Sequence, residues 1–197
     1  MLDVYCHLWS EDPTEIADVK DTLNPKKMIS ESHKYDLEFS SMEEEIRSTL
    51  EKGNGIDNIK KMASMHFSRN AAFNLIDEEY DTIVYSRYDV QIHQSFKFDN
   101  VHGILTPTAE SWGVISDIFA ILHIEYAKHY FLYDYMQNLL STQFESEFTK
   151  YLGTIYPAET IRIHNDERYC PHMLLLRNLF LNKVPIEKFD LPLSLQR

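Results

Sequence analysis

The chain has 197 residues, a length that suits one domain, or one domain with a small appendage. Hydrophobic residues make up 44% of it, enough for a sizeable core. A formal net charge of -12 and the lack of a long basic stripe disfavour sequence-independent binding of nucleic acid. They do not exclude a nucleotide ligand, because a divalent cation can bridge carboxylates to a diphosphate.

Cysteine spacing and hydropathy bear on the cellular compartment. Cys6 and Cys170 lie far apart and form neither a CxxC nor a zinc-ligand spacing, so we expect free thiols in a reducing compartment. No stretch approaches the roughly 20 apolar residues of a membrane span. The start of the chain lacks the basic region and cleavage site of a secretion signal. We predict a cytoplasmic protein without a transmembrane segment, and leave open a peripheral association with a membrane surface.

The first part of the chain alternates strand and helix signals. Leu2–Leu8 is apolar and β-compatible, a short helix runs from Thr14 to Leu23, and a second strand is expected at Lys27–Ser30. A capping-box pattern opens a helix at Ser41–Lys52. Apolar residues at helical spacing predict a strong helix from Ile56 to Glu79. This order is typical of an α/β domain.

The second part begins with the best strand in the chain. Asp81–Ser86 is nearly all apolar or β-branched, as a central strand covered on both faces should be. A long buried helix is predicted from Val114 or Ser116 to about Leu140. The remaining expected elements are a strand at Val101–Leu105, a helix at Phe144–Leu152, a strand at Thr160–His164, a helix at Pro171–Phe180 and an irregular tail from about residue 184. We expect one domain over residues 1–197.

Several familiar catalytic and nucleotide-binding signatures are missing. The chain has no GxGxxG after a strand, no GxxxxGK[ST], no HExxH and no GxSxG. It has only five glycines, so a phosphate-cradling glycine loop is not expected.

The first candidate site is Arg87-Tyr88-Asp89, directly after the best strand. Ligands of open α/β sheets bind beyond the carboxyl ends of the strands. Asp89 there could hold a hard divalent cation, and Arg87 could pair with a phosphate through its two-pronged guanidinium. The alternative is an Arg–Asp ion pair that only ties down a loop.

Three further positions are candidates, each with a structural alternative. Asp117 stands at the start of the predicted long helix and could contact a base or a sugar hydroxyl, with Trp112 stacking nearby; otherwise it caps the helix. His164 follows a predicted strand and could ligate a metal or contact a diphosphate, or lie in a solvated loop. His7 lies at the end of the first predicted strand. It could be a ligand, or it could be a half-buried structural histidine.

Five segments stand in an order and spacing found together in one family. They are Asp3–Trp9 with its terminal His-x-Trp, the helix Met65–Leu75, Tyr80–Val90 against a pattern YDxVIRxRxD, Gly113–Ala120 against G-x-x-D-x-F-A, and Phe144–Arg168. Together they resemble the GT-A-like glycosyltransferases of bacterial and viral surface-polysaccharide synthesis. The resemblance covers roughly Leu2–Val184.

The resemblance implies a GT-A-like, Rossmann-like fold with a mixed, mostly parallel sheet flanked by helices. It also implies a nucleotide-diphosphate sugar as donor, a glycan as acceptor, and Mn²⁺ or Mg²⁺ as cofactor. Asp89 stands where the family has its metal-binding carboxylate, and Asp117 where it has the acceptor-side or catalytic carboxylate. His164 carries over as a second metal ligand. The residues expected to contact the donor are Arg87, Asp89, His7 and Trp112.

The chain departs from the family in two ways. Such proteins usually begin with one more strand and helix that carry an SGxxR segment, whereas Met1 opens almost on the following strand. We expect that first strand to be absent, replaced or lost from a shortened reading frame. The metal motif is Arg-Tyr-Asp at residues 87–89 instead of Asp-x-Asp, which predicts a weaker metal site or a dispensable metal. The alternative function is a non-catalytic, degenerate transferase-like binding domain. An α/β hydrolase or phosphatase ranks last, since a nucleophile motif is missing.

Overall fold

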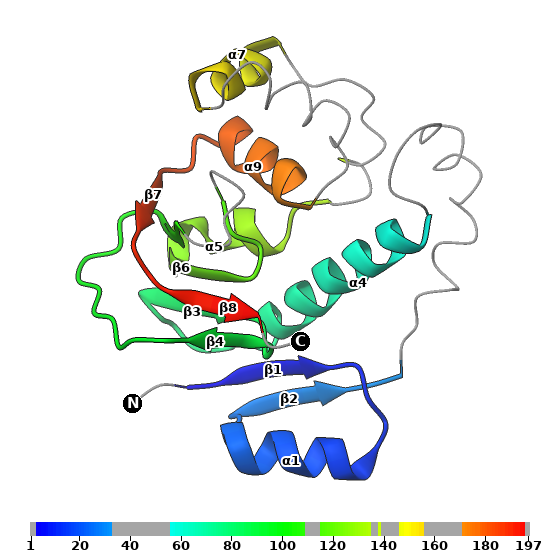
Figure 1. Ribbon diagram of the computed structural model, residues 1–197. Coiled ribbons are helices and arrows are strands. Elements are labelled where there is room, and N and C mark those ends of the chain that lie inside the picture. The colour runs from blue at the N-terminus through cyan, green and yellow to red at the C-terminus, as the bar shows by residue number, and fades with distance from the viewer. Residues whose placement is uncertain are drawn as a thin grey trace. The chain divides into compact units, whose positions relative to one another are not determined.

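The protein is described here from a computed structural model. The structure describes residues 3–32, 56–108, 115–134, 138, 146–155 and 171–195. The chain divides into two compact units, Met1–Glu79 and Tyr80–Arg197. Within the described residues there are five helices and three small sheets (Figure 1). The expected mixed α/β class is confirmed. The helix expected at Ser41–Lys52 and the strand expected at Thr160–His164 lie outside the described residues.

The first unit is built on a strand–helix–strand segment. Strands β1 (Tyr5–Leu8) and β2 (Lys27–Ser30) pair in parallel, and helix α1 (Pro13–Leu23) connects them. Helix α4 (Ile56–Phe73) packs against both strands. The three sequence-predicted elements before residue 31 are thus confirmed, and so is the α4 helix, which ends six residues before the expected Glu79.

Helix α1 owes its ends to local chemistry. The Asp12 side chain caps it by accepting a hydrogen bond from the Thr14 backbone N–H at 2.8 Å, and Pro13 fits the first turn because it has no N–H to satisfy. Asn24 ends it in the left-handed conformation, with φ of 44°, and donates its N–H to the Lys20 carbonyl at 2.9 Å.

The largest sheet lies in the second unit and has the strand order β3-β6-β5-β7. Its strands are β3 (Thr82–Ser86), β5 (Ile104–Pro107), β6 (Phe119–His123) and β7 (Ile186–Phe189). The β3–β6 and β5–β6 pairs are antiparallel, and only β5–β7 is parallel. The sheet is therefore mixed, and the expectation of a mostly parallel sheet is wrong. A separate antiparallel pair joins β4 (Val90–Ile92) to β8 (Leu193–Leu195).

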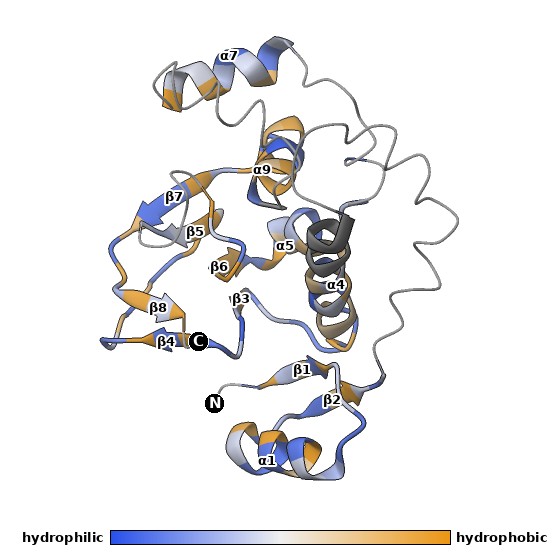
Figure 2. Cartoon of the chain, turned by 45° about the vertical axis from the view of Figure 1, so that its right-hand side comes forward, coloured by the Kyte–Doolittle hydropathy of each residue, from blue (hydrophilic) through white to orange (hydrophobic). Residues whose placement is uncertain are grey.

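Two expectations about the sheet are corrected. Strand β3 was expected at the centre, but it lies at one end of the described strand order and has half-buried or exposed side chains throughout. The buried strand is β6, in which four consecutive residues from Phe119 to Leu122 are fully buried. Figure 2 shows β6 in the colour of hydrophobic residues.

The long helix expected from Val114 or Ser116 to about Leu140 is not present in that form. Strand β6 occupies its first part, and helix α5 (Ile124–Phe131) follows immediately. The His123 ring caps α5 by accepting a hydrogen bond from the Glu125 N–H at 3.3 Å. A strand buried on both faces is apolar at every position, so it lacks the alternation that separates a strand from a buried helix. Asp117 consequently precedes a strand, and the helix-capping alternative for it is wrong.

The rest of the second unit is held by two helices and a structured tail. Helix α9 (Pro171–Leu181) packs against α5 and against α7 (Ser146–Ile155). The expected helices at Phe144–Leu152 and Pro171–Phe180 are therefore confirmed in type. The tail from residue 184 was expected to be irregular, but it forms β7 and β8. Among the described residues no helix is long and apolar enough to cross a membrane.

Candidate functional site

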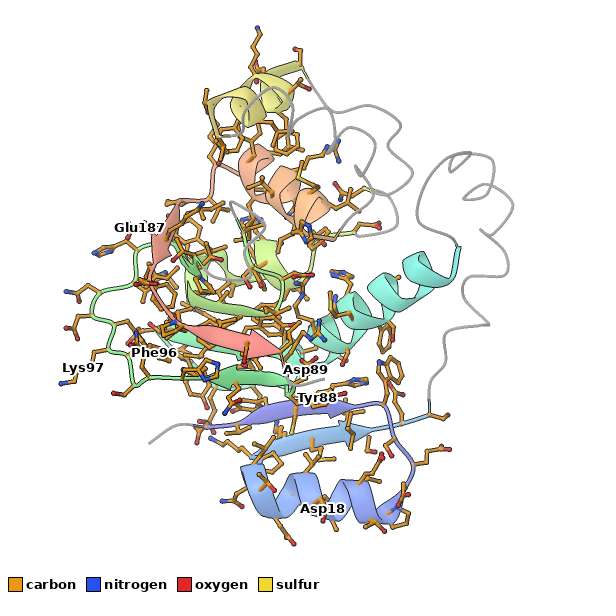
Figure 3. All side chains as sticks on the ribbon, in the orientation of Figure 1. Asp18, Tyr88, Asp89, Phe96, Lys97 and Glu187 are labelled. Carbon is orange, nitrogen blue, oxygen red and sulfur yellow. The ribbon has the colours of Figure 1, made fainter. Side chains whose placement is uncertain are left out.

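The turn after β3 places Arg87 and Asp89 in contact. The Arg87 Nε donates to Asp89 Oδ1 at 2.9 Å, and its Nη2 donates to Asp89 Oδ2 at 2.5 Å. The pair is partly open to solvent, with 32% of the Arg87 side chain and 18% of the Asp89 side chain exposed. This two-pronged geometry is the strongest form of an Arg–carboxylate pair. Figure 3 labels Asp89 and its neighbour Tyr88, whose side chain is 93% exposed.

The same turn lies beside the segment that carries Asp117. The Arg87 N–H donates to the carbonyl of Ile118 at 2.9 Å, and Ser86 pairs with Phe119 in the β3–β6 ladder. Burial by itself would lower the pKa of Arg87. The hydrogen bonds and charge of Asp89, with smaller contributions from Tyr85 and Asp117, raise it above its usual value. Asp89 is thus the carboxylate in contact with the Arg87 guanidinium, and the charge of Asp117 adds a smaller contribution without a contact among the described residues.

Asp117 is an unusual position for a carboxylate. It is 9% exposed, and none of the described residues donates a hydrogen bond to its side chain. Burying a charge is costly unless it is paired and hydrogen-bonded. Asp117 stays a candidate because its neighbour Ile118 is hydrogen-bonded to the turn that carries Arg87 and Asp89.

A buried polar network fixes the backbone around Asp117. The Ser116 N–H donates to the Thr106 Oγ1 at 2.7 Å, and the Tyr130 hydroxyl donates to the Ser116 carbonyl at 2.7 Å. The Ser116 Oγ accepts from the N–H groups of Ile118, at 3.3 Å, and Phe119, at 3.2 Å. Ser116, Thr106 and Tyr130 are all fully buried. Sequence analysis did not find this network, because its members lie on three separate elements.

His7 has a different environment in the first unit. Its side chain is fully buried, with Nδ1 2.7 Å from the Ser68 Oγ and Nε2 3.1 Å from the Glu31 Oε1. The rings of Trp9 and Phe67 lie against it, at centroid distances of 4.5 and 5.9 Å. Both ring nitrogens are thus engaged within the unit. A donor contact by His7 would require one of these bonds to be released.

Serine, histidine and glutamate also build acyl-transfer triads. Ser68, however, lies inside α4, where backbone N–H groups donate along the helix and cannot stabilise an oxyanion. We assign the Ser68–His7–Glu31 network to holding α4 against β1 and the end of β2. The sequence signal for it was weak, since Ser68 and Glu31 belong to no motif.

Replacing Ser68 by alanine should lower the free energy of unfolding by about 1 kcal/mol, because it removes one partly buried hydrogen bond. Urea unfolding followed by circular dichroism would measure the change. Ser32→Ala, at an exposed position of the same unit, is the matched control and should be neutral. Equal midpoints for the two variants would contradict the assigned role.

Two predicted site residues, Trp112 and His164, lie outside the described residues. In the described part of the chain, no three His, Cys, Asp or Glu side chains gather as a metal site. Cys6 on β1 is a free thiol there, as expected, and burial raises its pKa. The structure brings Arg87 and Asp89 into contact and places the segment of Asp117 beside their turn.

No protein-family model, curated protein or solved structure matches this chain.

Proposed function

We propose that the chain is a glycosyltransferase that moves a sugar from a nucleotide-diphosphate-sugar donor to a glycan acceptor in the cytoplasm. The observation that carries the proposal is the Asp89 carboxylate in contact with Arg87 at the end of β3, with the Asp117–Ile118 segment joined to the same turn by the bond from the Arg87 N–H to the Ile118 carbonyl. The parallel β1–α1–β2 segment and the antiparallel strands of the larger sheet are compatible with a GT-A-like, Rossmann-like fold, which is part of the proposal.

The donor set suits a hard divalent cation. Mg²⁺ in proteins is usually held by one or two carboxylates together with phosphate oxygens of the substrate. Asp89 would be the protein ligand, with His164 as the second ligand implied by the resemblance. Mn²⁺ or Mg²⁺, when bound, supplies a Lewis acid that neutralises the leaving diphosphate. The formal charges of Arg87, Asp89 and Asp117 sum to +1 − 2 = −1, which favours a cation over a bare anion.

The chain's own residues would have distinct roles. Asp117 would orient the acceptor hydroxyl and accept its proton as the sugar is transferred. Its nearly buried position supports this, because exclusion of water strengthens a carboxylate's interaction with a positively polarised hydroxyl. Arg87 would pair with a donor phosphate, and Trp112 remains a proposed donor contact.

Calorimetry with a panel of nucleotide sugars and Mn²⁺ tests the proposal. Wild-type protein should bind at least one donor, and Asp89→Asn should weaken that binding by about tenfold, the order expected for losing one charged metal ligand. Asp117→Asn should keep donor affinity but abolish transfer and donor hydrolysis. Asp99→Asn, at an exposed position of the same unit, is the matched control. Absence of binding across the panel, or an unchanged affinity in Asp89→Asn, would refute the assignment.

A second function is favoured by one observation. Both oxygens of Asp89 are engaged by Arg87, as in an ion pair that only stabilises a turn. On that basis the chain would be a degenerate transferase-like domain that binds a partner or a glycan without catalysis. It would fold and yet neither transfer nor hydrolyse any donor. Slow hydrolysis of one nucleotide sugar by wild-type protein, lost in Asp117→Asn, would remove this option.

A further inference from the structure

The turn after β3 exposes an aromatic ring beside the candidate site. Tyr88 is 93% exposed, whereas the other large hydrophobic side chains at the surface of the described residues are at most 46% exposed. We propose that Tyr88 is a stacking platform for a neutral sugar ring of the glycan acceptor. This inference rests on the proposed function and adds a residue that would hold the acceptor.

The ring of Tyr88 contributes little to the packing of the second unit. Aromatic side chains stabilise a fold mainly by burying their large apolar area. Tyr85 and Tyr130 do so, with ring centroids 5.7 Å apart and Tyr130 fully buried. In the part of the chain that the structure describes, Tyr88 has neither a ring contact nor a hydrogen bond of its side chain. Its ring is therefore available to a ligand.

The residues on either side hold Tyr88 in place. Arg87 and Asp89 are joined by their two bonds of 2.9 and 2.5 Å, while the side chain of Tyr88 between them is open to solvent (Figure 3). The Arg87 N–H donates to the Ile118 carbonyl at 2.9 Å, and the Val90 N–H donates to the Arg87 carbonyl at 3.3 Å. The backbone of the turn is thus fixed. A Tyr side chain has only two χ angles, so stacking on it costs little conformational entropy.

A sugar ring suits an exposed aromatic ring that is bordered by polar groups. The C–H face of a pyranose is apolar and weakly positive, and the face of an aromatic ring is negative. The sugar hydroxyls need polar neighbours, and Ser86, Arg87 and Asp89 border Tyr88 with side chains that are exposed or partly open to solvent. A nucleic-acid base could stack on the same ring, but the net charge of -12 opposes a polyanion. A neutral glycan is the better match.

Saturation-transfer NMR with neutral hexasaccharides, in the absence of nucleotide and metal, tests the platform. The probes are cellohexaose, laminarihexaose, maltohexaose and chitohexaose. We expect wild type to bind at least one of them, with the strongest transfer to ring C–H protons. Tyr88→Ala should weaken that binding about tenfold, the order expected for one aromatic contact. Tyr88→Phe keeps the ring and should bind within about twofold of wild type.

Leu132→Ala is the control for removing an exposed apolar side chain. Leu132 is 42% exposed and follows α5 in the same unit, so its replacement should leave the affinity for the hexasaccharide unchanged. Because Tyr88 is exposed, both of its variants should unfold at the wild-type midpoint. A single-stranded oligothymidylate is the competing probe. If it binds more tightly than every hexasaccharide, and Tyr88→Ala loses that binding, the ring serves bases and the sugar platform is refuted.

The outcomes separate this inference from the proposed function. No saturation transfer to any hexasaccharide, or equal affinities of Tyr88→Ala and wild type, would overturn the platform. The titration contains no donor, so a glycan can bind at Tyr88 even if no nucleotide sugar is ever used. Conversely, sugar transfer by wild type with an acceptor KM that Tyr88→Ala leaves unchanged would keep the transferase and reject the platform.

Discussion

Replacing Gly103 by alanine should destabilise the second unit by about 3 kcal/mol, the upper range for overpacking a tight site. A Cβ at this position would overlap the backbone carbonyl oxygen of Pro185 and approach its Cβ to 2.9 Å. Both obstacles belong to a rigid residue at the entrance to β7. The backbone would have to move, because no flexible side chain could yield.

The hydrogen bonds around Gly103 oppose that movement. The Pro185 carbonyl accepts from the Ile104 N–H at 2.9 Å, next to the parallel β5–β7 pair. The Gly103 carbonyl accepts from the His123 N–H at 2.9 Å, which ties it to the end of β6. Displacing either group would disturb two strands of the largest sheet at once.

Urea unfolding monitored by circular dichroism would measure the effect. The matched control is Gly153→Ala at an exposed position of α7, where alanine is about 1 kcal/mol better than glycine as a helix former and should raise stability. A Gly103→Ala protein with a wild-type midpoint would show that the close approach of Gly103 to Pro185 is not required.

Local signals in the sequence were sufficient for the first three elements of the chain. The apolar, β-compatible segments and the short helix between them predicted β1, α1 and β2, with β2 at the observed residues. The helix was expected to begin at Thr14, but it begins at Pro13 and is capped by Asp12. These elements depend on short-range chemistry, which a single sequence displays.

Elements that depend on distant partners could not be predicted. Strands β7 and β8 follow Pro185 and Pro192, which suggested an irregular tail. Each pairs with a strand 80 or more residues away: Ile104 lies opposite Ile186, and Val90 opposite Leu195. Prolines at strand entrances leave the following N–H groups available for such pairing. The central position expected for β3 was wrong because apolar content alone does not reveal a strand's neighbours.

The candidate site was only partly visible in the sequence. The position of Arg87 and Asp89 after a strand was predicted, and so were the two alternatives for them, an ion pair or a ligand site. The resemblance implied that Asp117 belongs to the same site, but the predicted long helix placed it on the wrong element; the structure joins its neighbour Ile118 to the Arg87 backbone at the start of a strand. The network that anchors it depends on Thr106 and Tyr130, which come from β5 and α5.

Ser116 is the residue of that network whose removal should have the largest effect. Ser116→Ala would leave the N–H groups of Ile118 and Phe119 without their acceptor, in residues that are 5% and 0% exposed. Each buried donor left unpaired costs about 1–3 kcal/mol. Both hydrogen bonds are long, at 3.3 and 3.2 Å, so we expect each unpaired N–H to cost an amount near the low end of that range. The two together should lower the free energy of unfolding by about 2–3 kcal/mol.

Two comparisons make the measurement specific. Thr106→Val keeps the shape of the side chain and unpairs one buried donor, the Ser116 N–H, so it should cost about half as much as Ser116→Ala. Ser95→Ala, at an exposed position of the same unit, should be neutral. An order of unfolding midpoints other than Ser116→Ala below Thr106→Val below Ser95→Ala would contradict the assigned hydrogen bonds.

If Asp117 also serves as the base, Ser116→Ala should reduce turnover more than donor affinity, because Asp117 acts on the acceptor hydroxyl and not on the donor.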